Sequence, residues 1–281
     1  MTTDVRPIVN ADLLRCLPSR LTDRDRYIVR LLGEHTVLTS QQIADVGFTS
    51  QRVAERRMDQ LYRLRIVDRV RPIWRPGSAP YHWLLDEAGA AVLAAERGVE
   101  VSELGWNRRR VLTSIMSGQR LAHLVGVNGF FTALIRSARG SGGNQRLAKW
   151  WPERRCARHW RHLVEPDGFG VWVDGPARVP FLLEYDCGTE RPGSRLAAKL
   201  PGYARLAAAD SSEARWWLLF RFPGRQREEN MRRALAGATI PVATTALAPG
   251  ETPAGPAWLP LTWPSSAPRM TLGELSGVAP G

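Results

Sequence analysis

Hydrophobic residues in the first third of the chain recur with the period of an α-helix. Ile28, Leu31 and Leu32 fall on one helical face. Thr22 precedes them and has Asp25 three residues later, which is the spacing of a capping box. The same reasoning predicts helices over about 22–35, 39–47, 49–65 and 86–97, and strands over 66–71 and 81–85. Three helices followed by a hairpin are typical of a winged helix-turn-helix.

After residue 111 the pattern predicts helices and strands that alternate. The expected elements are helices over about 112–138, 195–209 and 226–235, and strands over 147–151, 169–173, 181–185 and 215–222. Their order predicts an αβββαβ core with a mixed sheet, and hence an α+β chain. The expected division is a flexible N-terminus (1–20), a winged helix-turn-helix (21–98), a linker (99–111), an α/β domain (112–236) and a poorly ordered Pro/Ala/Gly-rich tail (237–281).

The composition favours a cytoplasmic protein that binds a polyanion. Lys and Arg number 39 and Asp and Glu 27 among 281 residues, so the net charge is +12. Nucleic acid is the polyanion that fits such a charge best. Three cysteines are too few for a disulfide framework. We expect no membrane segment, because no uninterrupted apolar run approaches about 18 residues and the start lacks the pattern of a signal peptide.

The predicted helix over 49–65 has one face for a core and another for a ligand. At 100° per residue, one stripe consists of Ala54, Met58 and Leu61. The opposite side carries Arg52, Arg56 and Arg63, and the predicted hairpin adds Arg69, Arg71 and Arg75. Guanidinium groups bind phosphates and read guanine, so these arginines predict binding to double-stranded DNA. A solvated arginine face, or a helix-turn-helix that docks on protein, is the alternative.

Three carboxylates are expected to converge in the second half. Asp167 stands at the entry of one predicted strand. Glu184 and Asp186 stand near the end of its hairpin partner, two residues apart and therefore on one face. Such a convergence predicts a site for Mg²⁺, which activates water and stabilises charge on a phosphate. Lys199, in the next helix, is placed to assist. The alternative is a turn aspartate and solvated acids at a strand end.

The segments Pro166-Asp167-Gly168 and Glu184-Tyr185-Asp186 resemble the motif of the PD-(D/E)XK nuclease superfamily, over about residues 145–235. The resemblance implies catalytic roles for Asp167, Glu184, Asp186 and Lys199, with the three acids as metal ligands. The superfamily places a lysine two residues after the glutamate, where this chain has Asp186. A lysine moved to the following helix is known in the superfamily, and Lys199 fits that position.

A wider set of sequence blocks spans about residues 20–235. The blocks are 38–43, 61–69, 82–89, His123 with Asn128, 166–168 and 184–189. In order and spacing they resemble the replication-relaxation family of bacterial plasmids and integrated mobile elements. The resemblance implies DNA as the partner and mobile-element maintenance as the setting. The family's name links it to plasmid replication and to DNA relaxation or nicking.

The sequence features described above are compatible with several functions. One is a Mg²⁺-dependent endonuclease or nickase. Another is a non-catalytic regulator or replication accessory factor, whose degenerate nuclease-like domain serves dimerisation or docking. A third is an assembly platform that uses the winged helix to bind protein. Besides double-stranded DNA, the expected partners are a second copy of the chain and proteins of replication or conjugation.

Residues 146–161 form a second basic segment, in which six Lys and Arg residues accompany the single acid Glu153. The segment also holds Trp150, Trp151 and Trp160. Cations mixed with aromatic rings are typical of proteins that bind single-stranded nucleic acid. Partly buried tryptophans beside a solvated arginine face are the alternative.

Overall fold

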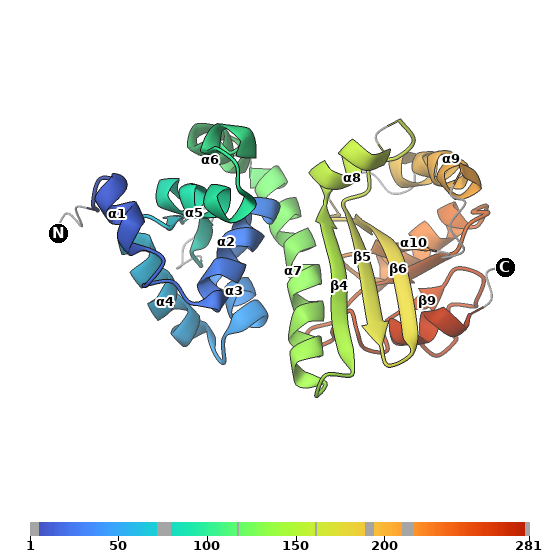
Figure 1. Cartoon of the computed structure of the whole chain (residues 1–281). Coiled ribbons are helices and arrows are strands. Elements are labelled where there is room, and N and C mark those ends of the chain that lie inside the picture. Colours follow the sequence, from blue (N-terminus) through green and yellow to red (C-terminus); the bar gives the residue numbers. More distant parts are fainter. Residues whose placement is uncertain are drawn as a thin grey trace. The chain divides into compact units, whose positions relative to one another are not determined.

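The computed structural model describes residues 6–71, 80–116, 118–160, 162–188, 194–209 and 216–278 (Figure 1). The chain forms two compact units, unit 1 (residues 1–128) and unit 2 (residues 129–281). The division falls within helix α7 (Gly118–Gly140). It lies beyond the linker expected over 99–111, where the structure has instead a 3₁₀ helix, η1 (Val101–Leu104), and the start of α6 (Arg108–Met116).

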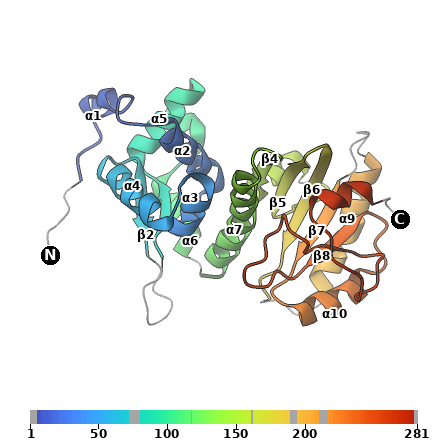
Figure 2. The ribbon, with the colours of Figure 1, turned by 90° about the horizontal axis from the view of Figure 1, so that it is seen from below.

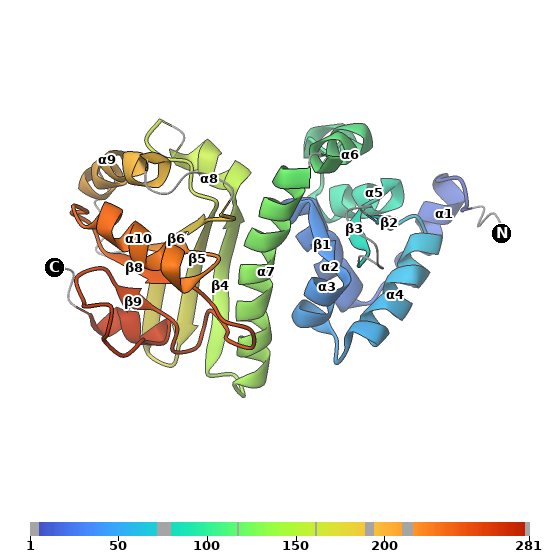
Figure 3. The same cartoon turned by 180° about the vertical axis from the view of Figure 1, so that it is seen from behind.

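Unit 1 combines short helices with a small antiparallel sheet (Figure 3). Its remaining elements are α1 (Ala11–Cys16), α2 (Asp23–His35), β1 (Val37–Thr39), α3 (Ser40–Gly47), α4 (Gln51–Arg63), β2 (Val67–Val70), β3 (His82–Leu85) and α5 (Glu87–Arg97). The strand order is β1-β3-β2. Helices α2 to α5 and the hairpin strands lie where the sequence predicts them, whereas α1 falls in the segment expected to be flexible. Strand β1 was not predicted, because a three-residue strand carries too little alternation to be seen.

Local signals in the sequence begin the helices of unit 1. Thr22 and Asp25 form the predicted capping box of α2, and Thr39 and Gln42 form one at α3. The core stripe of α4 is confirmed, since the side chains of its apolar face are fully buried. Helix α4 therefore presents its opposite face to solvent (Figure 2).

The N-terminal residues are more ordered than expected. The described part of 1–20 contains α1, and Leu17 is 1% exposed. Arg6 donates a 2.8 Å hydrogen bond to the buried carboxylate of Asp86. A segment expected to be flexible is thus held by an ion pair to a residue 80 positions away, which no local pattern shows.

Unit 2 is built on a six-stranded mixed sheet. Its strands, in spatial order, are β4 (Gln145–Pro152), β5 (Gly168–Asp174), β6 (Ala177–Tyr185), β7 (Trp217–Arg221), β8 (Val242–Thr245) and β9 (Leu259–Pro260). Strands β4, β5 and β6 pair antiparallel, and β6, β7 and β8 pair parallel. The helices are the end of α7, α8 (Glu153–Trp160), α9 (Ser194–Ala209) and α10 (Arg225–Leu235). The chain is therefore α+β, as predicted.

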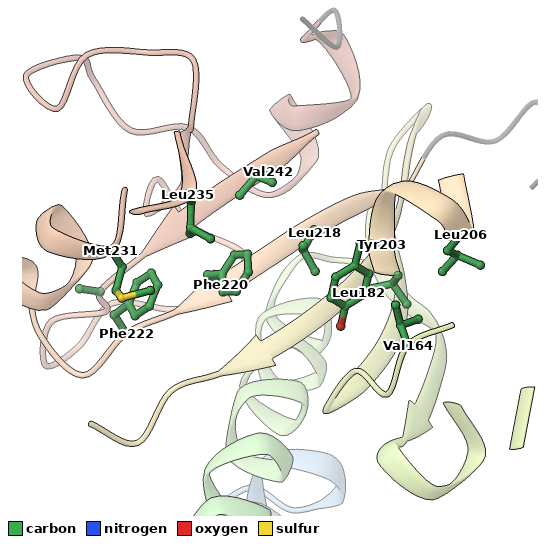
Figure 4. Close-up of a cluster of buried hydrophobic side chains, with 11 residues drawn as sticks. Val164, Leu182, Tyr203, Leu206, Leu218, Phe220, Phe222, Met231, Leu235 and Val242 are labelled. Carbon is green, nitrogen blue, oxygen red and sulfur yellow. The ribbon is translucent and has the colours of Figure 1, made fainter. Parts of the chain in front are cut away.

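Helices cover both faces of this sheet. On one face, Phe131 of α7 stacks on Phe181 of β6, with ring centroids 5.8 Å apart. Gly170 of β5 makes room for Phe181, because a Cβ atom there would lie 2.3 Å from that ring. On the other face, α9 and α10 contribute Tyr203 and Met231 to a hydrophobic cluster with the strands (Figure 4).

Residues 237–278 are not the poorly ordered tail that their composition predicts. They supply β8 and β9 to the sheet, and Trp258 is fully buried. Arg232 of α10 holds them by donating hydrogen bonds to the carbonyl groups of Leu259 (3.0 Å) and Trp263 (2.6 Å). The order arises from these long-range contacts, so proline and glycine content alone gave the wrong expectation.

Among the described residues, α7 alone is long and apolar enough to cross a membrane by length and composition. The core helix of a soluble protein passes the same test. Leu134 and Phe131 are fully buried within unit 2. In unit 1, Asn128 donates a 2.7 Å hydrogen bond to the carbonyl group of Val37. Part of the apolar surface of α7 is thus buried within the protein.

Candidate functional site

Helix α4 carries a cluster of free cations, made of Arg52, Arg56 and Arg63. All three side chains are exposed. Within the described part of the chain, none of them forms a hydrogen bond or an ion pair through its guanidinium group. Because Ala54, Met58 and Leu61 anchor the opposite face, the cluster, called here the α4 arginine face, stands on a rigid support.

The hairpin arginines differ from this face. Arg69 forms an ion pair with Asp59 and lies over the rings of Tyr62 and Tyr81, with its Cζ atom 4.4 and 4.5 Å from their centroids. It therefore serves to hold the hairpin on α4. Arg71 is exposed, although its Cζ atom lies 4.2 Å from the ring centroid of Tyr81. Arg75, predicted to act with them, lies outside the described residues.

In unit 2, strands β5 and β6 bring Asp167 to Glu184. Asp167 comes directly before β5, and its Oδ2 atom accepts a 2.6 Å hydrogen bond from the backbone N–H of Tyr185. Glu184 is 1% exposed, and its Oε2 atom accepts a 2.7 Å hydrogen bond from Nζ of Lys199 on α9. The predicted grouping of Asp167, Glu184 and Lys199 is present.

A pocket of about 440 Å³ adjoins this cluster, and we call it the Asp167 pocket. Its charged and polar lining consists of Glu153, Glu165, Asp167, Lys199, Tyr203 and Arg205. The mixture of carboxylates with cations suits a charged ligand rather than an apolar one. Glu184 is not part of the lining, but it binds two lining residues, Lys199 and Tyr203.

The titration of Glu184 reflects its burial. Burial raises the pKa of Glu184 to about 7, and the nearby negative charge of Asp167 adds to the effect. The ammonium group of Lys199 and the hydroxyl group of Tyr203 act in the opposite direction. Burial alone would lower the pKa of Lys199, but attraction to Glu184 outweighs it and raises that pKa. The buried carboxyl group of Glu184 is thus held between the ammonium group of Lys199 and the hydroxyl group of Tyr203 at the edge of the pocket.

Asp186 does not join this cluster, which corrects the expectation of three converging acids. Its carboxylate forms an ion pair with Arg227 of α10 and accepts a 2.7 Å hydrogen bond from the backbone N–H of Gly188. Strand β6 ends at Tyr185. Asp186 then pairs with Arg227 of α10, whereas Glu184 pairs with Lys199 of α9. Asp186 is thus held as a structural ion pair.

The comparison with protein families decides the affiliation of the chain. The family model described as replication-relaxation matches residues 29–216, which is more than half of the chain. The chain belongs to the replication-relaxation family. No curated protein and no solved structure matches it. Both the α4 arginine face and the Asp167 pocket of this replication-relaxation protein fall within the matched residues.

Sequence reasoning missed Tyr203, which completes the site of this replication-relaxation protein. Its ring is fully buried in the cluster of Figure 4, and its hydroxyl group donates a hydrogen bond to Oε1 of Glu184. Burial and the charge of Glu184 raise the pKa of Tyr203, which keeps the phenol protonated as a donor. The signal was available, because Lys199 and Tyr203 stand four residues apart and so share one helix face.

Without Asp186, the donors left for the predicted Mg²⁺ are Asp167 and Glu184. The described residues hold no group of three side chains that could bind a metal ion. Mg²⁺ does not need one, because it keeps several waters and takes one or two carboxylates together with substrate phosphate. Asp167 lines the pocket and is a hard oxygen donor of that kind. Glu184 is also a hard donor, but Lys199 and Tyr203 bind its two oxygen atoms, so it fits Mg²⁺ only if one of these partners gives way.

Proposed function

We propose that this replication-relaxation protein binds double-stranded DNA in the replication or relaxation of plasmids or mobile elements. The observation that carries the proposal is the α4 arginine face, made of three exposed guanidinium groups that pair with none of the residues that the structure describes. The order of helices and strands in unit 1 supports a winged helix-turn-helix, in which α4 enters the major groove. Arg71, near the end of β2, would contact the backbone as part of a wing.

The test is duplex affinity in a charge-matched pair of variants. The triple variant R52A/R56A/R63A should bind a labelled duplex at least tenfold more weakly than the wild type, since three phosphate or base contacts are removed. The variant R109A/R110A/R120A loses the same charge at exposed positions elsewhere in unit 1 and should retain most of the affinity. Equal losses in the two variants would refute a specific role for α4.

A second function is favoured by the Asp167 pocket, and we propose it as phosphodiester hydrolysis. Asp167, Glu184 and Lys199 occupy the strand entry, the strand end and the following helix, as in the PD-(D/E)XK superfamily with a displaced lysine. Asp167 would hold Mg²⁺ together with Oε2 of Glu184, which Lys199 would release to the ion. When bound, this ion polarises a phosphate oxygen and activates water. Lys199 would stabilise the charge that develops on the phosphate, and Tyr203 would keep Glu184 in position.

Nicking of supercoiled plasmid in the presence of Mg²⁺ tests this second function. Asp167→Asn and Lys199→Ala should each lower the nicking rate by about a hundredfold or more, because each removes a charge at the reacting phosphate. Glu229→Gln, an exposed acid on α10, is the control and should nick at the wild-type rate. If Asp167→Asn nicks like the wild type, the Asp167 pocket is not the site of hydrolysis. If the wild type does not nick, the protein is a non-catalytic DNA-binding factor.

A further inference from the structure

A basic and aromatic surface lies on β4 and α8 of unit 2. Trp151 is packed among other rings, with its centroid 4.9 Å from that of Phe169 and 5.3 Å from that of His159. Two cations lie over the same ring, with Lys149 Nζ 5.8 Å and Arg155 Cζ 4.6 Å from the centroid. We call the set formed by Lys149, Trp151, Arg155, Arg158 and His159 the α8 surface.

The local structure explains why these side chains share one side. Strand alternation places Lys149 and Trp151 on the same face of β4, and Trp150 on the other, where it stacks on Phe131 at 5.1 Å. On α8, Arg155, Arg158 and His159 follow the spacing of one helix face, and all three are exposed. Cys156, between them, is buried and anchors the helix.

The α8 surface carries more positive than negative charge. Lys149 and Arg158 are exposed, and neither forms an ion pair with any residue that the structure describes. Glu153 is the one acid between residues 146 and 161. Such an excess of positive charge creates a local field that favours an anionic partner.

The α8 surface continues into the Asp167 pocket. Trp151 pairs with Phe169 across β4 and β5, and Asp167 comes two residues before Phe169. Glu153, the first residue of α8, lines the pocket together with Asp167. The α8 surface and the pocket are therefore neighbours along β4, β5 and the start of α8.

We propose that the α8 surface binds single-stranded DNA and leads that strand to the Asp167 pocket. The exposed ring of His159, which packs against Trp151, can stack on a base, and the neighbouring cations can bind the phosphates of the same strand. The bases of a duplex are stacked on one another, so their faces are not accessible to His159. An acidic protein would use the cations but not the rings. The inference rests on the proposed hydrolysis only where it says that the bound strand enters the Asp167 pocket. It does not depend on duplex binding by unit 1.

The test measures the binding of the full chain to a labelled 20-nucleotide single strand by fluorescence anisotropy over a range of salt concentrations. The variant K149A/R158A/H159A should bind at least tenfold more weakly. The slope of log affinity against log salt should fall by about 1.4, because two cations are removed at about 0.7 each. His159→Ala alone should weaken binding several-fold without changing the slope. The control R178A/R233A removes two exposed arginines elsewhere in unit 2 and should bind like the wild type.

Three results would overturn the proposal. The α8-surface variant could bind the single strand like the wild type, or the control could lose as much affinity. Polyglutamate could also compete as well as unlabelled single strand, which would indicate a site for acidic protein. Duplex affinity and nicking by the same proteins separate this inference from the proposed function. Loss of single-strand affinity in a protein that never nicks would support the α8 surface and refute hydrolysis.

Discussion

Asp25 shows how a single carboxylate organises unit 1. It accepts 2.7 Å hydrogen bonds from both the backbone N–H and the hydroxyl group of Thr22, which begins α2. It also accepts hydrogen bonds of 3.0 and 2.6 Å from Nε and Nη2 of Arg57 on α4. Burial alone would raise the pKa of Asp25, but the hydrogen bonds from Arg57 and Thr22 outweigh it and lower that pKa. One residue thus positions the helix that carries the α4 arginine face.

Asp25→Asn should lower the free energy of unfolding by about 3 kcal/mol at pH 7, because it leaves Arg57 without its charged partner. Since the folded pKa lies below the ordinary 3.8, the carboxylate stabilises the protein above that pH. That stability is lost as the pH falls through the folded pKa, so the difference between variant and wild type should shrink below about pH 4. Chemical denaturation at several pH values measures it. The exposed Asp23→Asn is the control, and a loss there of similar size would contradict the account.

Gly89 is required by close packing rather than by a turn. A Cβ atom at this position of α5 would lie 2.1 Å from the carbonyl oxygen of Ile66. Gly89→Ala should therefore destabilise unit 1 by about 2 kcal/mol through overpacking, although alanine is the better helix former. Gly140→Ala, where nothing lies within 4 Å of the added atom, should be neutral or stabilising. Thermal unfolding of the two variants distinguishes these signs.

At the scale of elements, Arg232 is the connection that holds the C-terminal strands. Its guanidinium group is buried and donates to the Thr244 hydroxyl group and to carbonyl groups of residues 259–263. Arg232→Met should lower the free energy of unfolding by about 3 kcal/mol, since several buried acceptors lose a charged donor. It should also speed proteolysis within residues 246–263. The neighbouring, exposed Arg233→Met should change neither quantity measurably. Equal effects would mean that β9 is held in another way.

The elements that the sequence predicts well are those whose burial follows a local period. Helix α4 is of this kind, because its apolar stripe is buried along its length. Strand β6 was visible through another local signal, the apolar run 181–183, which is buried on both faces of the sheet. Strand β1 and the C-terminal segment are different. Val37 pairs with Leu84, and Trp258 packs against Phe130, each across a long stretch of chain. Such contacts leave no periodic signal, so they could not be predicted from spacing.

The candidate site was predicted in the same uneven way. Asp167 and Glu184 could be placed together because a hairpin fixes the register of its strands. The place of Asp186 could not be inferred, because it depends on Arg227, which lies 41 residues further on. The two-residue spacing predicted that Asp186 shares a face with Glu184. That rule holds only within a strand, and β6 ends at Tyr185, before Asp186.

At the scale of the molecule, the net charge of +12 has two separate uses. Many arginines form ion pairs within the protein, as Arg57, Arg65 and Arg227 do. Among the described residues, cations without an ion pair include the three arginines of the α4 arginine face in unit 1 and Lys149 and Arg158 of the α8 surface in unit 2. A protein that binds duplex DNA at one unit and a single strand at the other would need this distribution.

The most direct test of the central claim is the salt dependence of duplex binding by the wild type and by R52A/R56A/R63A. If each arginine of the α4 face neutralises one phosphate, the slope of log affinity against log salt should fall by about 2.7 in the variant, at about 0.9 for each contact. The R109A/R110A/R120A control should keep the wild-type slope. An unchanged slope in R52A/R56A/R63A would show that α4 does not contact DNA and would contradict the account.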